Sequence, residues 1–314
     1  GDYPVFHLTA ITHRKNPIYL TTIVGKPPQE DFYLGRATER IFLPLLRTQL
    51  PEIVDMDMPV EGVFHNCVIV SINKRFPMQS RRLMSALWGL GQMSLVKTII
   101  TVDATVNVHN YDEVINLLLN KVNFERDLFF SEGILDVLNH ASDNRLYGSK
   151  LGVDLTEKVE GEPGFGVNAP SALTDSVLPS TEEVKSYFPE LNGCRFLNFS
   201  SQRPIMLAAL NKTHSNQAKE FIETFFNEPK FSGVNILIVL EGHIDIENDS
   251  EVMWKFFNNL DPKRDFYFNK NRLGVDVTQK FKEEGYQQRW PEEIEMSKEI
   301  KERVDAKWDS IFKK

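Results

Sequence analysis

Two hydrophobic periods alternate along the chain, one typical of strands and the other typical of helices. Residues 5–12 and 18–24 are rich in β-branched and aromatic side chains, with a turn-forming stretch at 14–17 between them. This pattern predicts a β-hairpin over residues 4–25. Because a single hairpin is only marginally stable in water, we expect it to belong to a larger sheet.

From residue 30 onward, apolar positions follow helical spacing in some stretches and form short β-branched runs in others. The helical spacing predicts helices at about 30–48, 78–88 and 112–120. Pro44, which lacks a backbone donor, falls within the first of them. The β-branched runs predict strands at 63–72, 98–102 and 128–130. Alternating strands and helices indicate an α/β domain with a mixed sheet.

The second half of the chain repeats part of the first. Residues 102–130 align without a gap with residues 240–268 at an offset of 138, and seven of these 29 positions are identical. Residues 151–158 align with residues 273–280 at an offset of 122, and six of these eight positions are identical. The sequence therefore predicts a partial internal duplication of one α/β unit.

The two copies, about 61–158 and about 191–280, differ in length. Since the two offsets differ by 16, the first copy carries 16 extra residues between Ser131 and Lys150. A long segment that only one copy has is a candidate for function, because loops on a rigid scaffold often carry binding residues. A surface excursion without function is the alternative.

These patterns divide the chain into five segments. Glycine and proline concentrate in 161–190, which we interpret as a linker with a helix that begins near Ser180. Apolar positions at helical spacing over 291–312 predict an amphipathic helix that either caps its own domain or reaches another subunit. We expect a terminal hairpin, an α/β unit, the linker, a degenerate second copy and a C-terminal helix at 1–26, 27–160, 161–190, 191–281 and 282–314.

Composition and charge narrow the class of protein. Acidic side chains outnumber basic ones by 44 to 36, and the net charge of −8 repels a phosphate backbone, so we expect no nucleic-acid partner. The two cysteines are too few for a disulfide framework and suit a reducing compartment. No apolar run reaches the roughly 18 residues that cross a bilayer, and no secretory signal is present. We expect a cytoplasmic protein with no transmembrane segment.

The chain begins at Gly1 and has no initiator methionine. A leading glycine is typical of a cleaved expression tag, so we expect the chain to be part of a longer protein. In that case, residues that carry chemistry lie before Asp2.

The residues by themselves indicate no reaction. The seven histidines show no metal-type pairing, and the sequence has neither an HExxH nor a CxxC motif. Gly89 and Gly91 lack the third glycine of a dinucleotide fingerprint and are typical of a helix end. Polar residues at predicted strand ends either bind a ligand or cap turns: Asp103, Asn107, Glu241, His243 and Asp245.

Several ordered motifs together resemble the C-terminal portion of the UbiD family, the 3-polyprenyl-4-hydroxybenzoate decarboxylases and their relatives. The resemblance covers about 1–158 and 273–312. Its most specific piece is GSKLGVDLT at 148–156. The others are IT at 11–12, NPIY at 16–19, GKPP at 25–28, FLP at 42–44, LPEIVD at 50–55, MPVEG at 58–62, WGLGQM at 88–93, VNV at 106–108 and RWP at 289–291, continuing to Trp308.

The resemblance implies a non-oxidative, reversible decarboxylase of aromatic or α,β-unsaturated acids. Such enzymes use prenylated FMN with Mn2+ and K+, and a Glu-Arg-Glu constellation carries the proton chemistry. By resemblance, those groups lie upstream of this chain. We therefore expect no catalytic residue, no metal ligand and no bound cofactor in this fragment, and its cofactor-binding residues stay unknown.

The resemblance also implies a fold and a few site residues. The expected fold is a mixed-sheet α/β C-terminal domain of UbiD type with a partial duplication, preceded by a β-hairpin left from a split barrel. Near Gly91 and Gln92 some relatives place a basic residue by the cofactor phosphate, which this chain lacks. The substrate pocket is expected to be lined by one barrel residue, Ile18, and by one loop: Ile134, Leu135, Asp136, Val137 and Leu138.

We therefore interpret the chain as the C-terminal fragment of a decarboxylase of hydroxybenzoate-like acids in quinone biosynthesis. The fragment supplies an active-site lid and an oligomerisation surface, and is expected to be inactive alone. Its expected partners are further copies of itself, the missing N-terminal half and a small aromatic acid. The alternative is a non-enzymatic assembly module built on the duplicated unit. Ligand binding at the strand ends is a third reading.

Overall fold

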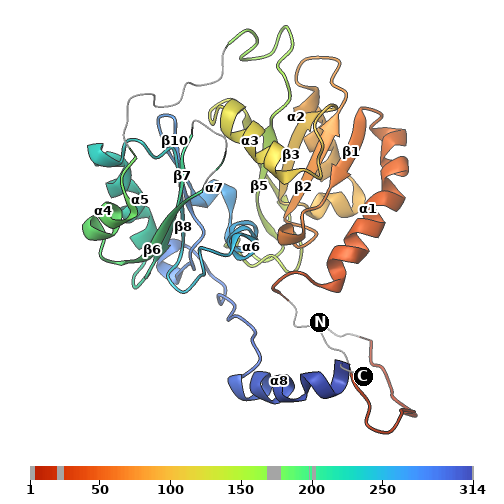
Figure 1. Cartoon of the computed structure of the whole chain (residues 1–314). Helices are drawn as coiled ribbons and strands as arrows, with labels where there is room; N and C mark the ends of the chain where they lie inside the picture. The colour runs from red at the N-terminus through yellow and green to blue at the C-terminus, as the bar shows by residue number, and fades with distance from the viewer. Residues whose placement is uncertain (1–3, 20–24, 168–177, 198, 200–202, 313–314) are drawn as a thin grey trace. The chain divides into compact units, whose positions relative to one another are not determined.

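The computed structural model describes residues 4–19, 25–167, 178–197, 199 and 203–312. The chain divides into two compact units, residues 1–25 with 293–314 and residues 26–292. The first unit contains one helix, α8 (Lys298–Phe312), in its described part. This helix begins later than the predicted residue 291. All the strands described below belong to the second unit (Figure 1).

The predicted hairpin over residues 4–25 differs from what the structure has. Residues 4–19 form no strand, and residues 20–24 lie outside the described part of the chain. The physical reason is that two strands without a larger sheet gain too little burial to stay paired in water.

The first copy is a five-stranded mixed sheet in the order β1-β2-β3-β5-β4. The three central strands are parallel and the edge strands β1 and β4 are antiparallel to their neighbours. Its strands are β1 (Ile53–Asp57), β2 (Cys67–Ile72), β3 (Thr98–Asp103), β4 (Leu128–Ile134) and β5 (Tyr147–Asp154). Its helices are α1 (Glu30–Gln49), α2 (Gln79–Trp88) and α3 (Tyr111–Lys121).

The second copy has the same strand order, β6-β7-β8-β10-β9. Its strands are β6 (Leu191–Leu197), β7 (Ile205–Leu210), β8 (Ile236–Glu241), β9 (Phe266–Asn269) and β10 (Arg272–Asp276). Its helices are α4 (Thr181–Tyr187), α5 (Gln217–Asn227), α6 (Asp249–Asn259) and the short α7 (Pro262–Asp265). The mixed α/β fold and the internal duplication expected from the sequence are confirmed.

The duplication extends to the hydrogen-bond register. Cys67 pairs with Thr98 in the first sheet, and Ile205 pairs with Ile236 in the second, both at the offset of 138. The irregularity between Ile53 and Asp55 in β1 recurs between Leu191 and Gly193 in β6. The repeat therefore begins at β1, earlier than residue 61 and at a strand that the sequence pattern did not reveal.

Local signals explain several boundaries. The Asn110 side chain accepts a hydrogen bond from the Glu113 amide at the start of α3, and Asn248 does the same at the start of α6. Ser180 begins α4 with a capping box, as its sequence predicts. The strand expected from residue 63 begins only at Cys67, because Val63 and Phe64 have φ values of 45° and 68°.

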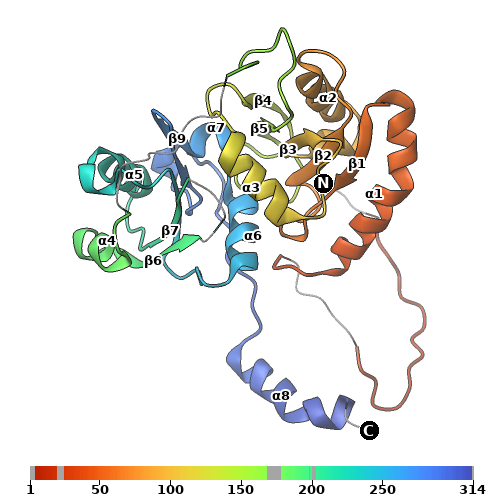
Figure 2. The same cartoon turned by 45° about the horizontal axis from the view of Figure 1, so that its top comes forward.

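Apolar residues on both faces of the sheets form the core. Alternate residues of β2, such as Val68 and Val70, pack against α1 and α2, while Ile69 lies in the core on the other side of the sheet. That second core joins both copies and includes residues of α3 and α6, which carry labels in the middle of Figure 2. The rings of Phe130 and Phe266 meet in it edge to face, 6.1 Å apart.

The extra residues of the first copy lengthen two strands and add a loop. β4 and β5 stay paired as far as Ile134 and Tyr147, and residues 135–146 connect them. The equivalent strands β9 and β10 are joined by a two-residue turn at 270–271. The 16 residues are thus a hairpin extension that carries the segment expected to line a substrate pocket.

Candidate functional site

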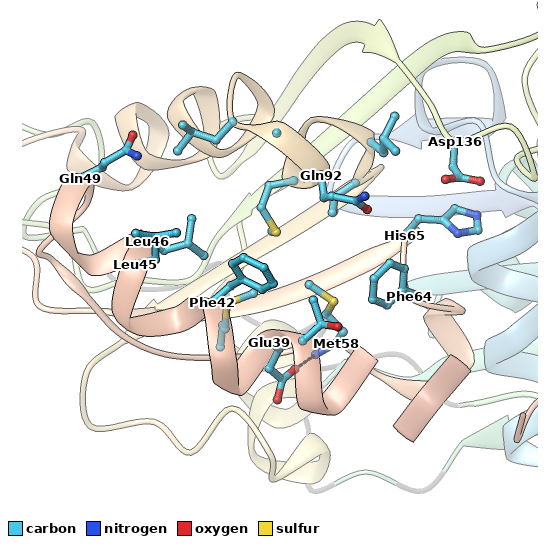
Figure 3. Close-up of a pocket in the computed structure, with 17 residues that line it drawn as sticks. Glu39, Phe42, Leu45, Leu46, Gln49, Met58, Phe64, His65, Gln92 and Asp136 are labelled. Atoms are coloured by element: carbon cyan, nitrogen blue, oxygen red, sulfur yellow. Dashed lines mark hydrogen bonds between the residues drawn. The ribbon is translucent and has the colours of Figure 1, made fainter. Parts of the chain in front are cut away.

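A cavity of about 290 Å³ lies between α1 and the short helix Gly91–Leu95 (Figure 3). Most of its wall is apolar. Phe42 and Leu45 stand at an exposed edge of α1, whereas Met56 and Met93 are buried. The lining residues are Thr38, Glu39, Phe42, Leu45, Leu46, Gln49, Met56, Met58, Phe64, His65, Leu90, Gly91, Gln92, Met93, Leu95, Val96 and Asp136.

One end of the cavity is polar. Figure 3 shows the His65 ring beside the Asp136 carboxylate. His65 is buried, and its Nε2 atom has no hydrogen-bond partner among the described residues. Burial lowers the pKa of His65 to about 4, although the Asp136 carboxylate acts to raise it. His65 is therefore neutral at pH 7, and its unpaired Nε2 atom is itself buried.

Glu39, the second carboxylate of the wall, is already satisfied. It is buried and accepts hydrogen bonds from the Met58 amide at 3.0 Å and from Arg40 Nε at 3.1 Å. The bond from Met58 ties α1 to the chain that follows β1. Glu39 is thus part of the frame of the cavity.

Two buried lysines donate hydrogen bonds to the backbone carbonyls of residues that line the cavity. Lys97 donates its amide to the His65 carbonyl at 3.0 Å and its Nζ to Asn139 Oδ1 at 3.1 Å. Burial lowers the pKa of Lys97 to about 7. Lys150 Nζ donates to the carbonyls of Ser94 and Val96, both at 2.8 Å, and burial lowers its pKa to about 8.

His65, Lys97 and Lys150 were not predicted from the sequence. Lysine is rarely buried, so the position of Lys97 before the apolar run 98–102 gives no signal of burial. His65 has no signal either, because its neighbours form no motif.

The expected pocket segment 134–138 has one residue in this cavity, Asp136. Leu135 is buried at 2% exposure, while Ile134, Val137 and Leu138 are exposed at 54%, 59% and 58%. Asp136 Oδ1 accepts the Leu138 amide at 2.9 Å, and its carbonyl accepts the Asn139 amide at 3.0 Å, which fixes a tight turn. Ile18 belongs to the other unit, so its role as a lining residue stays a prediction.

The strand-end residues act as turn and cap residues. Asp103 accepts the Glu157 amide at 2.9 Å, and the equivalent Glu241 accepts the Gln279 amide at 3.2 Å. Asn107 and Asp245 accept amides two residues ahead, at 3.0 Å each. The geometry therefore supports the turn-capping alternative for these four residues.

The cavity does not fit a flavin phosphate or a metal. Its lining residues include no lysine or arginine, and two of them are carboxylates. The described parts of the chain contain no group of three or more His, Cys, Asp or Glu residues that could hold a metal ion. Nor does any helix described here have the length and apolar character to cross a membrane.

Curated relatives of this chain include proteins from a bacterium and an archaeon. An uncharacterized protein of Helicobacter pylori strain J99 is 34% identical over 310 residues, which cover 97% of this chain and 48% of that protein. An uncharacterized protein of Archaeoglobus fulgidus is 52% identical over 157 residues, which cover 50% of this chain and 33% of that protein. The chain thus spans about half the length of its Helicobacter relative and about a third of the length of its Archaeoglobus relative.

Two of the solved structures that this chain resembles match about half of its length. The open form of vanillic acid decarboxylase from Sedimentibacter hydroxybenzoicus is 25% identical, with a TM-score of 0.44, and the match covers 57% of this chain and 37% of that one. The UbiD-class enzyme HmfF from Pelotomaculum thermopropionicum, in complex with FMN, is 19% identical, with a TM-score of 0.38 and coverage of 50% and 34%.

The family models decide the assignment. The model of the 3-octaprenyl-4-hydroxybenzoate carboxy-lyase C-terminal domain matches residues 32–155 and 172–285, which include both sheets. The model of the Rift-related domain of the same carboxy-lyases matches residues 1–27, where the sequence indicated a barrel hairpin. The chain belongs to the UbiD carboxy-lyase family, as a C-terminal portion of its members.

Proposed function

We propose that the chain is the C-terminal part of a prenylated-flavin-dependent decarboxylase that acts on hydroxybenzoate-like acids in quinone biosynthesis. The observation that carries this proposal is the family match over 32–155 and 172–285. The family description names a carboxy-lyase of a prenylated hydroxybenzoate, so the proposed reaction releases carbon dioxide from an aromatic acid.

In this proposal the chain supplies a lid and part of the pocket wall. The exposed side chains of Val137 and Leu138 offer apolar surface to an aromatic ring, which is the kind of lining that small-molecule sites use. Ile134, Asp136 and Ile18 complete the proposed lining. Leu135 supports the segment from below because it is buried.

Prenylated FMN, Mn2+ and K+ bind outside this chain in the proposal. The cavity between α1 and Gly91–Leu95 lacks the cations that a flavin phosphate needs, so we assign no flavin step to it. The carboxylates of the Glu-Arg-Glu constellation are also supplied by the other half of the protein. The chain alone is therefore proposed to be inactive and to bind none of these groups.

The proposed partners are further copies of the chain in a cytoplasmic oligomer. Support comes from the outer face of α1, where several large apolar side chains are exposed: Tyr33, Leu34, Ile41, Phe42 and Leu45. The same face favours the second candidate function, an assembly module without catalysis. Light scattering on the chain, before and after deletion of 291–314, separates an interface on α1 from one on the C-terminal helix.

The experiment that tests the proposed function measures carbon dioxide release from a panel of hydroxybenzoates. Its two samples are the complete protein that contains this chain, prepared with prenylated FMN, and the chain alone. We expect release by the complete protein only. No release by the complete protein contradicts the proposal, and release by the chain alone contradicts its claim of inactivity.

A further inference from the structure

The loop that only the first copy has, residues 135–146, lies against the second copy and the chain that follows it. Arg264 pairs with Asp143 at 2.6 Å, and Gln288 Nε2 donates to the Ser142 carbonyl at 2.9 Å. Both partners of the loop come from beyond residue 259, more than 100 residues away in the sequence. Residues distant in the sequence therefore hold this loop at more than one point.

Several of these contacts surround His140. Its Nε2 atom lies 3.0 Å from Asn259 Oδ1, at the end of α6. The Tyr286 hydroxyl donates to the His140 carbonyl at 2.7 Å, and the Trp290 ring meets the imidazole edge to face at 5.0 Å. Residues of the second copy and its extension therefore hold both the side chain and the backbone of one loop residue.

The orientation of the Asn259 amide is fixed from its other end. Its Nδ2 donates to the Val277 carbonyl at 3.0 Å, which turns Oδ1 toward His140. Burial lowers the pKa of His140 to about 4, so the ring is neutral at pH 7. Because Oδ1 only accepts, the ring carries its proton on Nε2 and donates it to Asn259.

Asn139, the residue before His140, connects His140 to the proposed pocket segment. Asn139 accepts from Lys97 Nζ at 3.1 Å and donates to Ser142 Oγ at 3.1 Å, so it is held on two sides. The Asn139 amide in turn bonds to the Asp136 carbonyl and closes the tight turn. A shift of His140 therefore moves the turn that presents Val137 and Leu138.

A second anchor lies at the base of the same hairpin. The Asp261 carboxylate accepts the Ser149 hydroxyl, and the Lys263 amide donates to Ser149 Oγ at 3.0 Å. Ser149 is buried in β5, in the lengthened part of the strand. The hairpin is thus fixed at its base and near its tip by one neighbouring body, which sets its direction.

The second copy itself has no such loop, because only residues 270–271 separate β9 from β10. One copy carries the segment and the other holds it. We propose that the second copy is the scaffold that positions segment 134–138, and that Asn259 is the positioning residue through its contact with His140. The statement about the scaffold stands on the contacts alone, and its consequence for substrate rests on the proposed function.

Hydrogen exchange on the 314-residue chain tests the scaffold, with the amides of Leu138 and Asn139 as probes. We expect Asn259→Ala to speed their exchange by about tenfold or more. Tyr286→Phe removes a single hydroxyl contact and is expected to give a smaller increase of the same sign.

The matched control is Val252→Ala, which truncates a core residue of the same helix α6 away from the loop. It lowers global stability and is expected to leave the two probe amides as in the wild-type chain under native conditions. Unchanged exchange in both Asn259→Ala and Tyr286→Phe overturns the proposal. So does an equal increase in Val252→Ala.

The consequence for substrate is measured on the complete protein. We expect Asn259→Ala to raise KM for an aromatic acid about tenfold with a smaller change in kcat, because the pocket wall is displaced while the proton-transfer groups stay in place. An unchanged KM overturns the link to substrate. If the wild-type protein releases no carbon dioxide, the proposed function fails, and the exchange result still decides the scaffold claim.

Discussion

Asp57 Oδ1 lies 2.8 Å from His109 Nδ1, and the equivalent positions in the second copy hold Arg195 and Glu247, 3.3 Å apart. The two copies thus keep a polar contact at the same place, with the acidic residue on the strand in the first copy and on the loop in the second. In both, the contact joins the first edge strand to the loop after the central strand. Its persistence after the acidic residue has changed sides indicates that the link itself supports the fold.

The two pairs differ in burial, which predicts different energetic weights. Asp57 is fully buried and also accepts the Tyr111 hydroxyl at 2.7 Å, whereas Glu247 is 72% exposed. We expect Asp57→Ala to lower the free energy of unfolding by about 3 kcal/mol. Arg195→Ala is expected to lower it by at most about 1 kcal/mol. Urea unfolding of both variants checks this, and equal losses would be inconsistent with the structure.

Lys97 gives a prediction for pH. Its pKa falls from 10.5 to about 7 on folding because the side chain is buried. Between these values the unfolded chain binds more protons at this site than the folded chain, so this contribution to stability rises with pH. Relative to Lys97→Met, the wild-type chain should gain up to about 1.4 kcal/mol per pH unit above pH ~7.

The measurement is urea unfolding of both proteins at several pH values, because their difference cancels the titration of groups that both share. A difference that stays constant with pH would show that Lys97 is charged in the folded state. That result would contradict the lowered pKa of the buried Lys97 side chain.

The aromatic core of the second copy predicts a stability difference at one position. Phe231 occupies the place of Met93, a cavity-lining residue of the first copy, and stacks on Phe225 with centroids 4.6 Å apart. Phe231→Met is expected to cost about 1–2 kcal/mol through the lost ring contact. Met93→Leu conserves volume and serves as the matched control. A smaller loss for Phe231→Met than for the control contradicts this view of the filled core.

Much of the fold could be predicted from the sequence where period and length agree. The expected strand 98–102 and helix 112–120 fall within one residue of β3 and α3. The repeat offset of 138 is also the offset between strand registers. The strand β1 was not predicted, because its five residues, IVDMD, do not alternate regularly between apolar and polar side chains. The hairpin at 4–25 carries strand-forming residues without a sheet to join.

The site was less predictable because it forms only on folding. Asp136 lines the cavity, its expected place in a substrate pocket stays a prediction, and its neighbour His65 lies 71 positions earlier without a motif. The contact between His140 and Asn259 could not be predicted either. An alignment of the repeats relates equivalent positions of the two copies, and these two residues do not occupy equivalent positions. Pairwise contacts between copies follow from packing, which a one-dimensional pattern does not specify.

The central claim, which rests on the proposed function, is that segment 134–138 of this chain lines the substrate pocket of the complete protein. The most direct test is kcat/KM of the complete protein for an aromatic acid after the double change Val137→Ala and Leu138→Ala. Val167→Ala, at a residue 68% exposed and outside the segment, is the control. We predict a loss of about tenfold or more, equivalent to ~1.4 kcal/mol, for the double variant and none for the control. An unchanged kcat/KM in the double variant would contradict the claim.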